Sequence, residues 1–422
     1  MLAGHKYAAL LSFEGPDRYS SIGGLGTRAS ALATALGAAG VQTQLFFVGD
    51  PSLPATQTWT PGVTLRRWCQ WISAHHPRNA YDGEESKVED FCHSVPRAVA
   101  EIVAAAHREG ERVLVIAEEW QTAEAATTLD GLLLESAQRG AATILWNANN
   151  TYGFDHMRWP ALQRAATITT VSKYMKFELA RWDVPALVIP NGIDAALLDG
   201  PAPATVERLR SALRGRPALL KVGRFDPDKN WLAAIDAVSD LRAGGLQPQL
   251  VVRGGSEPYG ETVFERARLR GLSVERSAVD GDDLDALYAA LSAASADVVR
   301  LDAFLPERTL AAFYAASDAV LANSGKEPFG LVGLEVMAAG GVPVCGSTGE
   351  DYAEPFVNAI VCDGDDGREL AEYLRAVAGD AARLERMRQA GYATAARYVW
   401  ANVLEMLALK LRYIGGLRER TL

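Results

Sequence analysis

The segment "SGKEPFGLVGLEVMAAG", residues 324–340, decides the fold that we expect, because a strand, a turn and a helix meet in it. It begins at the end of the apolar run "DAVLANS", which has the composition of a buried strand. "GKEPFG" contains turn residues, and "LVGLEVMAAG" has the composition of a helix. A strand that leads through a short turn into a helix is the repeating unit of a parallel α/β sheet.

Two carboxylates, Glu327 and Glu335, lie eight positions apart across the Pro-Phe-Gly turn of this segment. The turn places the N–H groups of Phe329, Gly330 and Leu331 at a helix start, where they can bind phosphate or a sugar hydroxyl. Glu335 can accept hydrogen bonds from a vicinal diol, and Glu327 would face what lies beyond the phosphates. Alternatively, Glu335 is an exposed helix residue and Glu327 a favourable charge near the helix dipole, which leaves Pro-Phe-Gly unexplained.

Outward from this segment, short apolar runs alternate with Ala-rich and Leu-rich helical stretches. This alternation indicates parallel strands joined by crossover helices, and hence two doubly wound α/β halves that we expect to face a cleft. The runs are "YAALLSF", "QTQLFFVG", "RVLVIAEE", "ATILWNAN" and "ALVIPNG", followed by "ALLKVG", "PQLVVRGG", "ADVVRLD", "DAVLANS" and "GVPVCGS". Because the interval "AALLDGPAPAT" breaks both periodicities, it predicts a linker between domains at residues 1–195 and 205–396.

Composition limits the classes of protein to consider. The 422 residues, 49% of them hydrophobic, can bury more than one core. A net charge of −10 argues against nucleic acid as a partner, and no apolar run reaches the roughly 18 to 20 residues that span a bilayer. The cysteines at positions 69, 92, 345 and 362 have no paired spacing, which argues against disulfides and a zinc site and fits a reducing cytoplasm.

Two further loops carry groups that suit an anion. The glycines of "GGLG", among them Gly23 and Gly24, follow the first strand and let backbone N–H groups approach an anion, although they could equally serve tight packing. "VGRFDPDKN" follows the first strand of the second half and carries Arg224 and Lys229. Alternatively, this is a solvated loop whose lysine pairs with Asp226 or Asp228.

The order of these motifs resembles one known family. "EPFGLVGLE" resembles the E-x7-E signature of retaining GT-B glycosyltransferases, in particular glycosyltransferase family 4 and its glycogen-synthase and sucrose-synthase relatives. "GGLG", "TVSKYM", "IPNGID", "VGRFDPDKN" and the terminal "YVW" helix resemble further elements of that family in the same order. The resemblance implies a GT-B fold of two Rossmann-like domains, with residues 397–422 forming a helix that crosses back to the first domain.

The resemblance also implies a role for each matched residue. Arg224 and Lys229 would hold the diphosphate of a nucleotide-sugar donor, Glu335 would bind the ribose, and Glu327 would contact the transferred sugar. The glycine loop at Gly23 and Gly24 would also contact the donor. Two cations and helix-terminal amides would stabilise the leaving diphosphate without a metal or another cofactor, and the configuration at the anomeric carbon would be retained.

The chain departs from this family in two places. In "AEEWQTA", Glu118 stands where glycogen synthases have a histidine, so that it would be either a sugar ligand with a different hydrogen-bond role or an acceptor contact. Ser21 stands where glycogen and starch synthases have a lysine, two residues before the paired glycines. A small acceptor is therefore favoured over a growing polymer.

The loop "WNANNTYGFDHMRW" is expected to recognise the acceptor, because amides and aromatic rings suit carbohydrates. Its candidate residues are Asn147, Asn149, Asn150, Tyr152 and His156, although an ordinary turn-rich loop is the alternative. Asp280 with Asp282, and Asp363 with Asp365, resemble a metal-binding Asp-x-Asp, but their turn-rich surroundings favour a local role and no metal.

Three other functions are compatible with such an architecture. A sugar-nucleotide epimerase or a GT-B phosphorylase would share the fold, and a non-catalytic protein could bind a nucleotide sugar without consuming it. Release of free nucleoside diphosphate only in the presence of an acceptor would distinguish transfer from all three.

Overall fold

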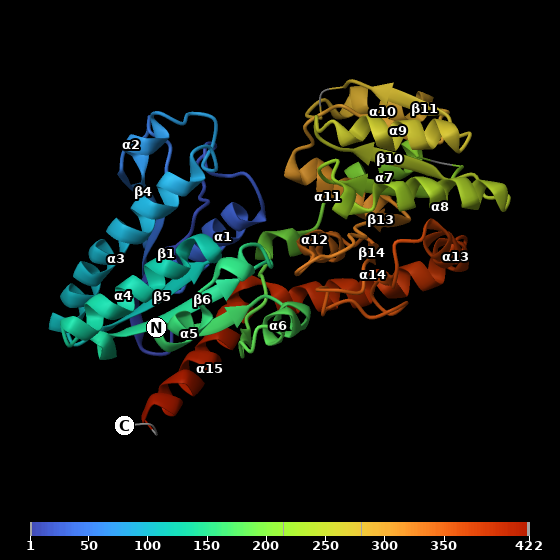
Figure 1. The fold of residues 1–422 in the computed structure, drawn as a ribbon. Coiled ribbons are helices and arrows are strands. Elements are labelled where there is room, and N and C mark those ends of the chain that lie inside the picture. The colour runs from blue at the N-terminus through green and yellow to red at the C-terminus, as the bar shows by residue number, and fades with distance from the viewer. Residues whose placement is uncertain (1, 214, 280, 420–422) are drawn as a thin grey trace. The chain divides into compact units, whose positions relative to one another are not determined.

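The computed structural model describes residues 2–213, 215–279 and 281–419, which form two compact units (Figure 1). The first unit contains the residues up to Gly192 together with those from Val399 onward. The second unit runs from Ile193 to Tyr398. Each unit is built around its own sheet.

The sheet of the first unit has the strand order β3-β4-β2-β1-β5-β6-β7-β8, parallel except for β3, which pairs antiparallel with β4. The strands are β1 (His5–Leu11), β2 (Gln42–Val48), β3 (Thr56–Thr60), β4 (Val63–Trp68), β5 (Arg112–Glu118), β6 (Ala142–Ala148), β7 (Thr167–Thr170) and β8 (Leu187–Val188). Because β1 lies between β2 and β5, the sequence of crossovers reverses direction there. The loops after β1 and β5 therefore flank the switch point, where open α/β sheets bind ligands.

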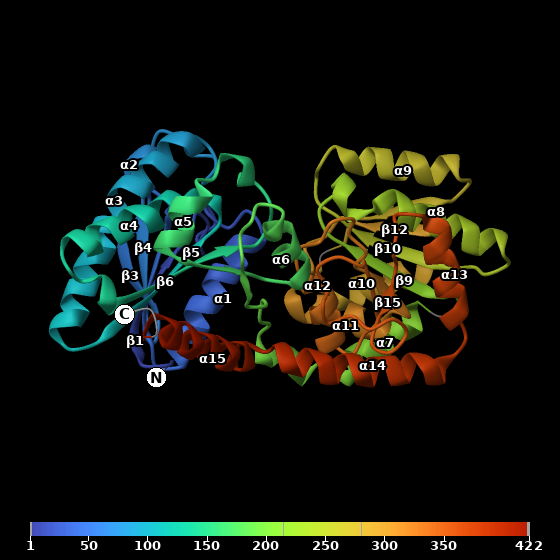
Figure 2. The same cartoon turned by 60° about the horizontal axis from the view of Figure 1, so that its bottom comes forward.

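The helices of the first unit are α1 (Gly24–Ala38), α2 (Gln70–Ser73), α3 (Glu84–Arg108), α4 (Ala123–Glu135), α5 (Trp159–Ala165), α6 (Lys173–Ala180) and the terminal α15 (Trp400–Glu419). Short 3-10 turns lie at Trp120–Thr122, Arg139–Ala141 and Phe154–His156. α15 lies against α1, as Figure 2 shows, and one face of it enters the core around β1. Trp400, Val403, Leu407 and Leu411 are the buried residues at successive turns of that face.

The sheet of the second unit is parallel, with the order β11-β12-β10-β9-β13-β14-β15. Its strands are β9 (Ala218–Val222), β10 (Gln249–Arg253), β11 (Val274–Ser277), β12 (Val298–Leu301), β13 (Ala319–Leu321), β14 (Pro343–Cys345) and β15 (Ile360–Val361). The chain crosses from β12 over to β13 on the other side of β9. The loops after β9 and β13 flank this second switch point.

Helices cover both faces of the second sheet, because neighbouring strand residues point to opposite sides. Leu219 of β9 belongs to a core with α8, α9 and α13, whereas Leu220 belongs to a core with α7, α10 and α11. The helices are α7 (Pro203–Ala212), α8 (Trp231–Ala243), α9 (Tyr259–Leu269), α10 (Leu284–Ala293), α11 (Glu307–Ala316), α12 (Leu331–Ala338), α13 (Gly367–Val377) and α14 (Ala381–Ala395). Short 3-10 turns lie at Ala195–Asp199, Pro227–Lys229 and Ala396–Tyr398.

The expected apolar runs all contain strands, but the sequence pattern did not single out β3, β4, β7, β11 and β15. These strands are short or polar, as in "TQTWT" of β3, so they lack a strong hydrophobic signal. The linker that we expected in "AALLDGPAPAT" ends earlier than predicted. Helix α7 already begins within it, at Pro203, because proline favours the first position of a helix. Among the described residues, no helix is long and apolar enough to cross a bilayer.

Candidate active site

An aromatic anchor fixes the turn between β13 and α12. Phe329 is buried, and its ring centroid lies 6.0 Å from that of Tyr352 and 6.2 Å from that of Tyr398. The next residue, Gly330, caps α12 in the left-handed region at φ 78°, and a Cβ there would lie 2.5 Å from Cγ of Glu350. Phenylalanine and glycine are therefore needed at these two positions for packing and backbone geometry.

The loop after β14 holds the same turn from a second side. Thr348 Oγ1 accepts a hydrogen bond from the N–H of Glu327 at 2.9 Å, and the N–H of Gly349 donates to the carbonyl oxygen of Glu327 at 2.8 Å. The hydroxyl of Tyr352 donates to the carbonyl oxygen of Gly330. The backbone of Glu327 is thus fixed, and its side chain is free to meet groups from other loops.

The structure brings Lys229 and Glu327 together from two loops that flank the switch point. Lys229 Nζ lies 2.9 Å from Glu327 Oε2 and also donates to Ser324 Oγ at 3.3 Å. Both side chains keep partial exposure, 37% for the lysine and 20% for the glutamate. Asp226, an alternative partner in the sequence, instead accepts from the N–H of Asp228 and caps the 3-10 turn. A cation and a carboxylate therefore converge at the carboxyl edge of β9 and β13.

Arg224 lies in the same loop as Lys229, and its side chain is exposed. Its carbonyl oxygen accepts a hydrogen bond from the indole Nε1 of Trp231 at 2.8 Å, which fixes the loop backbone. Within the described part of the chain, no residue forms a hydrogen bond or ion pair with the guanidinium group of Arg224. The group is therefore accessible to a ligand.

Glu335 lies one turn into α12 and is half-buried. Burial, and then the nearby carboxylate of Glu307, raise the pKa of Glu335 above its usual value. Its position near the helix start is the one that the sequence predicted, and its proposed contact with a ribose stays a prediction.

Two buried ionisable groups beneath the turn were not found from the sequence. Lys221 of β9 donates to the carbonyl oxygen of Leu321 and to Asn323 Oδ1, and burial followed by the charge of Lys229 lowers its pKa to about 7. Glu350 is buried beside Gly330, and burial followed by the carboxylate of Glu327 raises its pKa to about 8. Both lie in apolar strand or turn segments that carry no motif, so only their contacts reveal them.

In the first unit, the glycine loop already holds a carboxylate. Glu14 Oε2 accepts hydrogen bonds from the N–H groups of Gly23 at 2.8 Å and Gly26 at 3.0 Å. Its other oxygen accepts from the hydroxyl of Tyr81 at 2.6 Å. A Cβ on Gly24 would meet no atom within 4 Å, so there is free space beside this residue. An anion that bound at Gly23 would have to displace the carboxylate of Glu14.

Glu118 and two of the predicted acceptor residues form one buried network. Arg28 Nε lies 3.2 Å from both carboxylate oxygens of Glu118, and Asn147 and Asn149 donate to Oε2 at 2.9 and 2.8 Å. Arg28 also donates to Asn191. Glu118 is fully buried, and its oxygens are taken up by the protein itself. This carboxylate, at the position where the resemblance implied a histidine, connects α1, β6 and the loop after β6.

The next residue, Glu119, has a backbone conformation that is almost confined to glycine, at φ 68° and ψ 170°. The indole Nε1 of Trp146 donates to its carbonyl oxygen at 2.9 Å, and the N–H of Asn149 donates to Oε1 at 2.6 Å. Burial is the main cause that raises its pKa to about 8. A strained, buried carboxyl group at the carboxyl end of β5 is a functional candidate that the sequence did not reveal.

The other predicted acceptor residues lie apart from this network. Asn150 Oδ1 accepts from the N–H of Tyr152, which is a local turn contact, and the ring of Tyr152 is 70% exposed. His156 is exposed beside Asp155. They remain predicted acceptor contacts.

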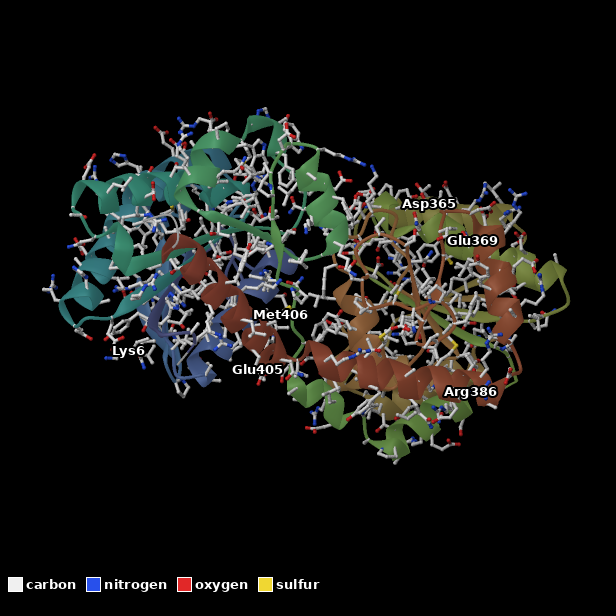
Figure 3. All side chains as sticks on the ribbon, turned by 90° about the horizontal axis from the view of Figure 1, so that it is seen from below. Lys6, Asp365, Glu369, Arg386, Glu405 and Met406 are labelled. Carbon is white, nitrogen blue, oxygen red and sulfur yellow. The ribbon has the colours of Figure 1, made fainter. Side chains whose placement is uncertain are left out.

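The Asp-x-Asp segments have local partners. Asp365 Oδ1 accepts from Asn230 Nδ2 at 2.6 Å, and Glu369 accepts from the N–H groups of Asp363 and Gly364. Figure 3 labels Asp365 and Glu369 on the second unit. Asp282 is exposed, and Asp280 lies outside the described residues. The described residues contain no cluster of three or more His, Cys, Asp or Glu side chains that could hold a metal ion.

Residues 207–394 match the family described as glycosyl transferases group 1. The matched residues lie within the second unit, which is therefore similar to that family. Over 213 residues, the chain is 30% identical to a D-inositol 3-phosphate glycosyltransferase of Thermobispora bispora. The match covers 49% of this chain and 46% of that relative, so the chain spans about half the length of the curated relatives it matches.

Similar solved structures show which fold the chain has. The sucrose-phosphate synthase from Thermosynechococcus elongatus has a TM-score of 0.67 and 22% identity, over 98% of this chain and 100% of that one. Anabaena HepE, solved in complex with UDP-glucose, has a TM-score of 0.61 and 17% identity, over 97% of this chain and 100% of that one. The chain therefore has two Rossmann-like domains and the GT-B fold, as the resemblance implied.

Proposed function

We propose that the chain transfers a glycosyl group from a nucleoside-diphosphate sugar to a saccharide or another small hydroxylated acceptor, with retention at the anomeric carbon. The donor would bind at the loops after β9 and β13 of the second unit. The contact between Lys229 and Glu327 carries this proposal, because it joins a phosphate-binding cation to a carboxylate that suits sugar hydroxyls. The match to group 1 glycosyl transferases supports the same reaction class.

Each residue of the donor site would act on a different part of the donor. Lys229, Arg224 and the N–H groups at the start of α12 would bind the diphosphate and stabilise the charge that develops as it leaves. Lys229 would exchange its ion pair with Glu327 for one with the diphosphate, and Glu327 would then accept hydrogen bonds from the sugar. Glu335 would bind the ribose hydroxyls. Such a site stabilises a leaving diphosphate with side chains and backbone amides alone, so a metal-independent reaction is part of the proposal.

The first unit would recognise the acceptor at the carboxyl ends of β5 and β6. Because both oxygens of Glu118 are bonded within the protein, its proposed role is to position Asn147 and Asn149. Glu119 and the exposed Tyr152 would then offer contacts to acceptor hydroxyls. The D-inositol 3-phosphate glycosyltransferase to which the chain is similar carries a polyol phosphate in its name, which supports a small acceptor rather than a polymer.

The test is to incubate the protein with UDP-, GDP- and ADP-sugars and a panel of monosaccharides and polyols. Free nucleoside diphosphate should appear only when the correct acceptor is present, and proton NMR of the product should show the anomeric configuration of the donor. Release without an acceptor, conversion of the donor to an isomer, or binding without consumption would contradict transfer. An inverted product would contradict retention alone.

A further inference from the structure

Lys221 is a buried ionisable residue that has no role in the proposed donor site. Its side chain lies on β9, a central strand of the second sheet, and only 3% of the residue is exposed. Nζ donates to the carbonyl oxygen of Leu321 at 3.0 Å and to Asn323 Oδ1 at 2.9 Å, and lies 5.3 Å from the ring centroid of Trp231. No carboxylate within the described ranges forms an ion pair with it. The ammonium group is held by neutral acceptors only.

The contacts of Lys221 lead directly to the donor site. Asn323 accepts from Lys221, and the next residue, Ser324, accepts from Lys229 through Oγ. Two lysines therefore hold two consecutive residues at the start of the turn, one from the core and one from the partly exposed side. Lys229 in turn contacts Glu327, so Lys221 is connected to the predicted sugar-binding carboxylate through three successive contacts.

Electrostatics makes the charge of Lys221 depend on what binds at Lys229. Burial disfavours the ammonium form of Lys221, and the positive charge of Lys229 adds to this effect. The negative charge of a diphosphate beside Lys229 would offset the positive charge of Lys229. The pKa of Lys221 would then rise and its amine would take up a proton, because charges interact strongly at low dielectric.

We propose that Lys221 is a positioning residue of the donor site, which holds Asn323 and Ser324 in place and takes up a proton when a nucleoside diphosphate binds at Lys229. The location of the diphosphate in this inference rests on the proposed function. The proton comes from the buffer acid and bonds to the free electron pair of the lysine nitrogen, while the ligand undergoes no covalent change.

The coupling fixes how affinity depends on pH. Below pH 6 the amine is already protonated, so binding takes up no proton at Lys221. Above a pKa of about 7 the amine is neutral in the free protein and must be protonated on binding, so affinity falls as the pH rises. Each unit by which binding raises the pKa of Lys221 corresponds to about a tenfold gain in affinity at low pH relative to high pH.

The first test is calorimetry with UDP, GDP and ADP between pH 7.5 and 8.5, in buffers of different ionisation enthalpy. The terminal phosphate of these probes, with a pKa of about 6, is ionised in this range and adds no proton of its own. For the wild type we expect uptake of up to one proton per bound nucleotide.

Lys221→Met and Lys221→Gln should abolish this uptake, and the glutamine variant keeps a donor for the carbonyl oxygen of Leu321. Lys326→Met, which removes an exposed lysine of the same turn, should leave uptake unchanged.

The second test is direct titration of Lys221 by NMR of lysine ¹³Cε signals, assigned by the signal lost in Lys221→Met. A midpoint near pH 7 in the free protein that rises with nucleotide would support the inference. A midpoint near 10.4, the usual lysine value, would overturn it. Nucleotide binding with no proton uptake would overturn the coupling but not the donor site. Failure of all three nucleotides to bind would overturn the proposed function and the coupling together.

Discussion

At the scale of single residues, the candidate site combines accessible charges with charges that the protein has already paired. Arg224 and Lys229 lie at or near the surface, whereas Arg28 and Glu118 are buried and bonded to each other. The guanidinium group of Arg224 has no partner among the described residues to give up, and Lys229 can exchange Glu327 for a ligand at little cost. The buried pair cannot, because either partner alone would be an uncompensated charge in the core.

Replacing Lys229 with alanine should lower kcat/KM at least about a hundredfold, because a preorganised cation at the leaving group is lost. Arg224→Ala should have a similar effect. Since both side chains are at least partly exposed, the melting temperature should stay within a few degrees of the wild type. Lys326→Ala, which removes an exposed lysine from the turn after β13, is the control for a general loss of charge, and steady-state kinetics is the measurement. Wild-type rates in both Arg224 and Lys229 variants would contradict the assignment.

Glu335→Ala should weaken binding of the nucleoside diphosphate by roughly tenfold or more, because a charged hydrogen bond to the ribose is lost. Isothermal titration with ordinary and 2′,3′-dideoxy nucleotides separates this role from a general structural effect. The dideoxy nucleotide should bind the wild type and the variant equally. Equal loss of affinity for both nucleotides would show that Glu335 does not contact the ribose.

Arg28→Met should destabilise the first unit by about 3–5 kcal/mol, because it leaves the carboxylate of Glu118 buried without a cation. The double variant Arg28→Met with Glu118→Gln should recover part of this loss. Urea unfolding followed by fluorescence measures both. Unchanged stability of the single variant would mean that water or another cation reaches Glu118.

At the scale of elements, the turn before α12 depends on a helix cap, an aromatic anchor and a loop from another strand. Gly330 at φ 78° and Gly340 at φ 79° lie at the two ends of α12, but only Gly330 has Glu350 within 2.5 Å of a built Cβ. A Cβ on Gly340 would meet no atom within 4 Å. Alanine at either glycine introduces backbone strain, but only alanine at Gly330 also introduces a steric clash. Comparing the two variants therefore separates these two effects.

Gly330→Ala should therefore abolish detectable nucleotide binding, because the turn must shift to avoid Glu350. Gly340→Ala should have the same backbone strain, about 1 kcal/mol, and keep nucleotide affinity. Thermal unfolding and calorimetric titration of both variants make the comparison. Equal affinity in the two alanine variants would show that the position of the turn does not control binding.

Glu350 should make the second unit less stable as the pH rises. Its pKa is raised to about 8 in the folded protein, so the folded state binds its proton more tightly than the unfolded chain, whose carboxyl has a pKa near 4.5. The free energy of unfolding should fall between pH 4.5 and 8 through this group. Glu350→Gln should remove that part of the pH dependence and raise the melting temperature at pH 8 more than at pH 5. An equal effect at both pH values would contradict a buried neutral carboxyl.

At the scale of the whole molecule, the fold followed from the sequence, but the contact between Lys229 and Glu327 and the buried polar network did not. The strands and the E-x7-E segment are local patterns, and the rule that ligands bind at switch points places the loops of Lys229 and Glu327 at one edge of the sheet. Glu14, Lys221 and Glu350 owe their state in part to partners far away in the sequence, as the contact between Lys221 and Asn323, 102 positions apart, illustrates. Periodicity contains no information on such contacts.

The packing of the terminal helix α15 on the core of the first unit should contribute to the stability of that unit. Leu407 is 1% exposed within the core around β1, whereas Leu409 on the same helix is 60% exposed. Leu407→Ala should cost about 2–5 kcal/mol of unfolding free energy, and Leu409→Ala should change it by less than about 0.5 kcal/mol. Denaturant unfolding of the two variants measures the difference. Equal stabilities would mean that α15 does not form part of the core.

The most direct test of the account is a crystal structure of the protein with a bound nucleoside diphosphate. We expect the diphosphate at the carboxyl edge of β9 and β13, with Lys229 Nζ and the N–H groups at the start of α12 within hydrogen-bonding distance and the ribose beside Glu335. A diphosphate bound elsewhere, with Lys229 still paired to Glu327, would contradict the account.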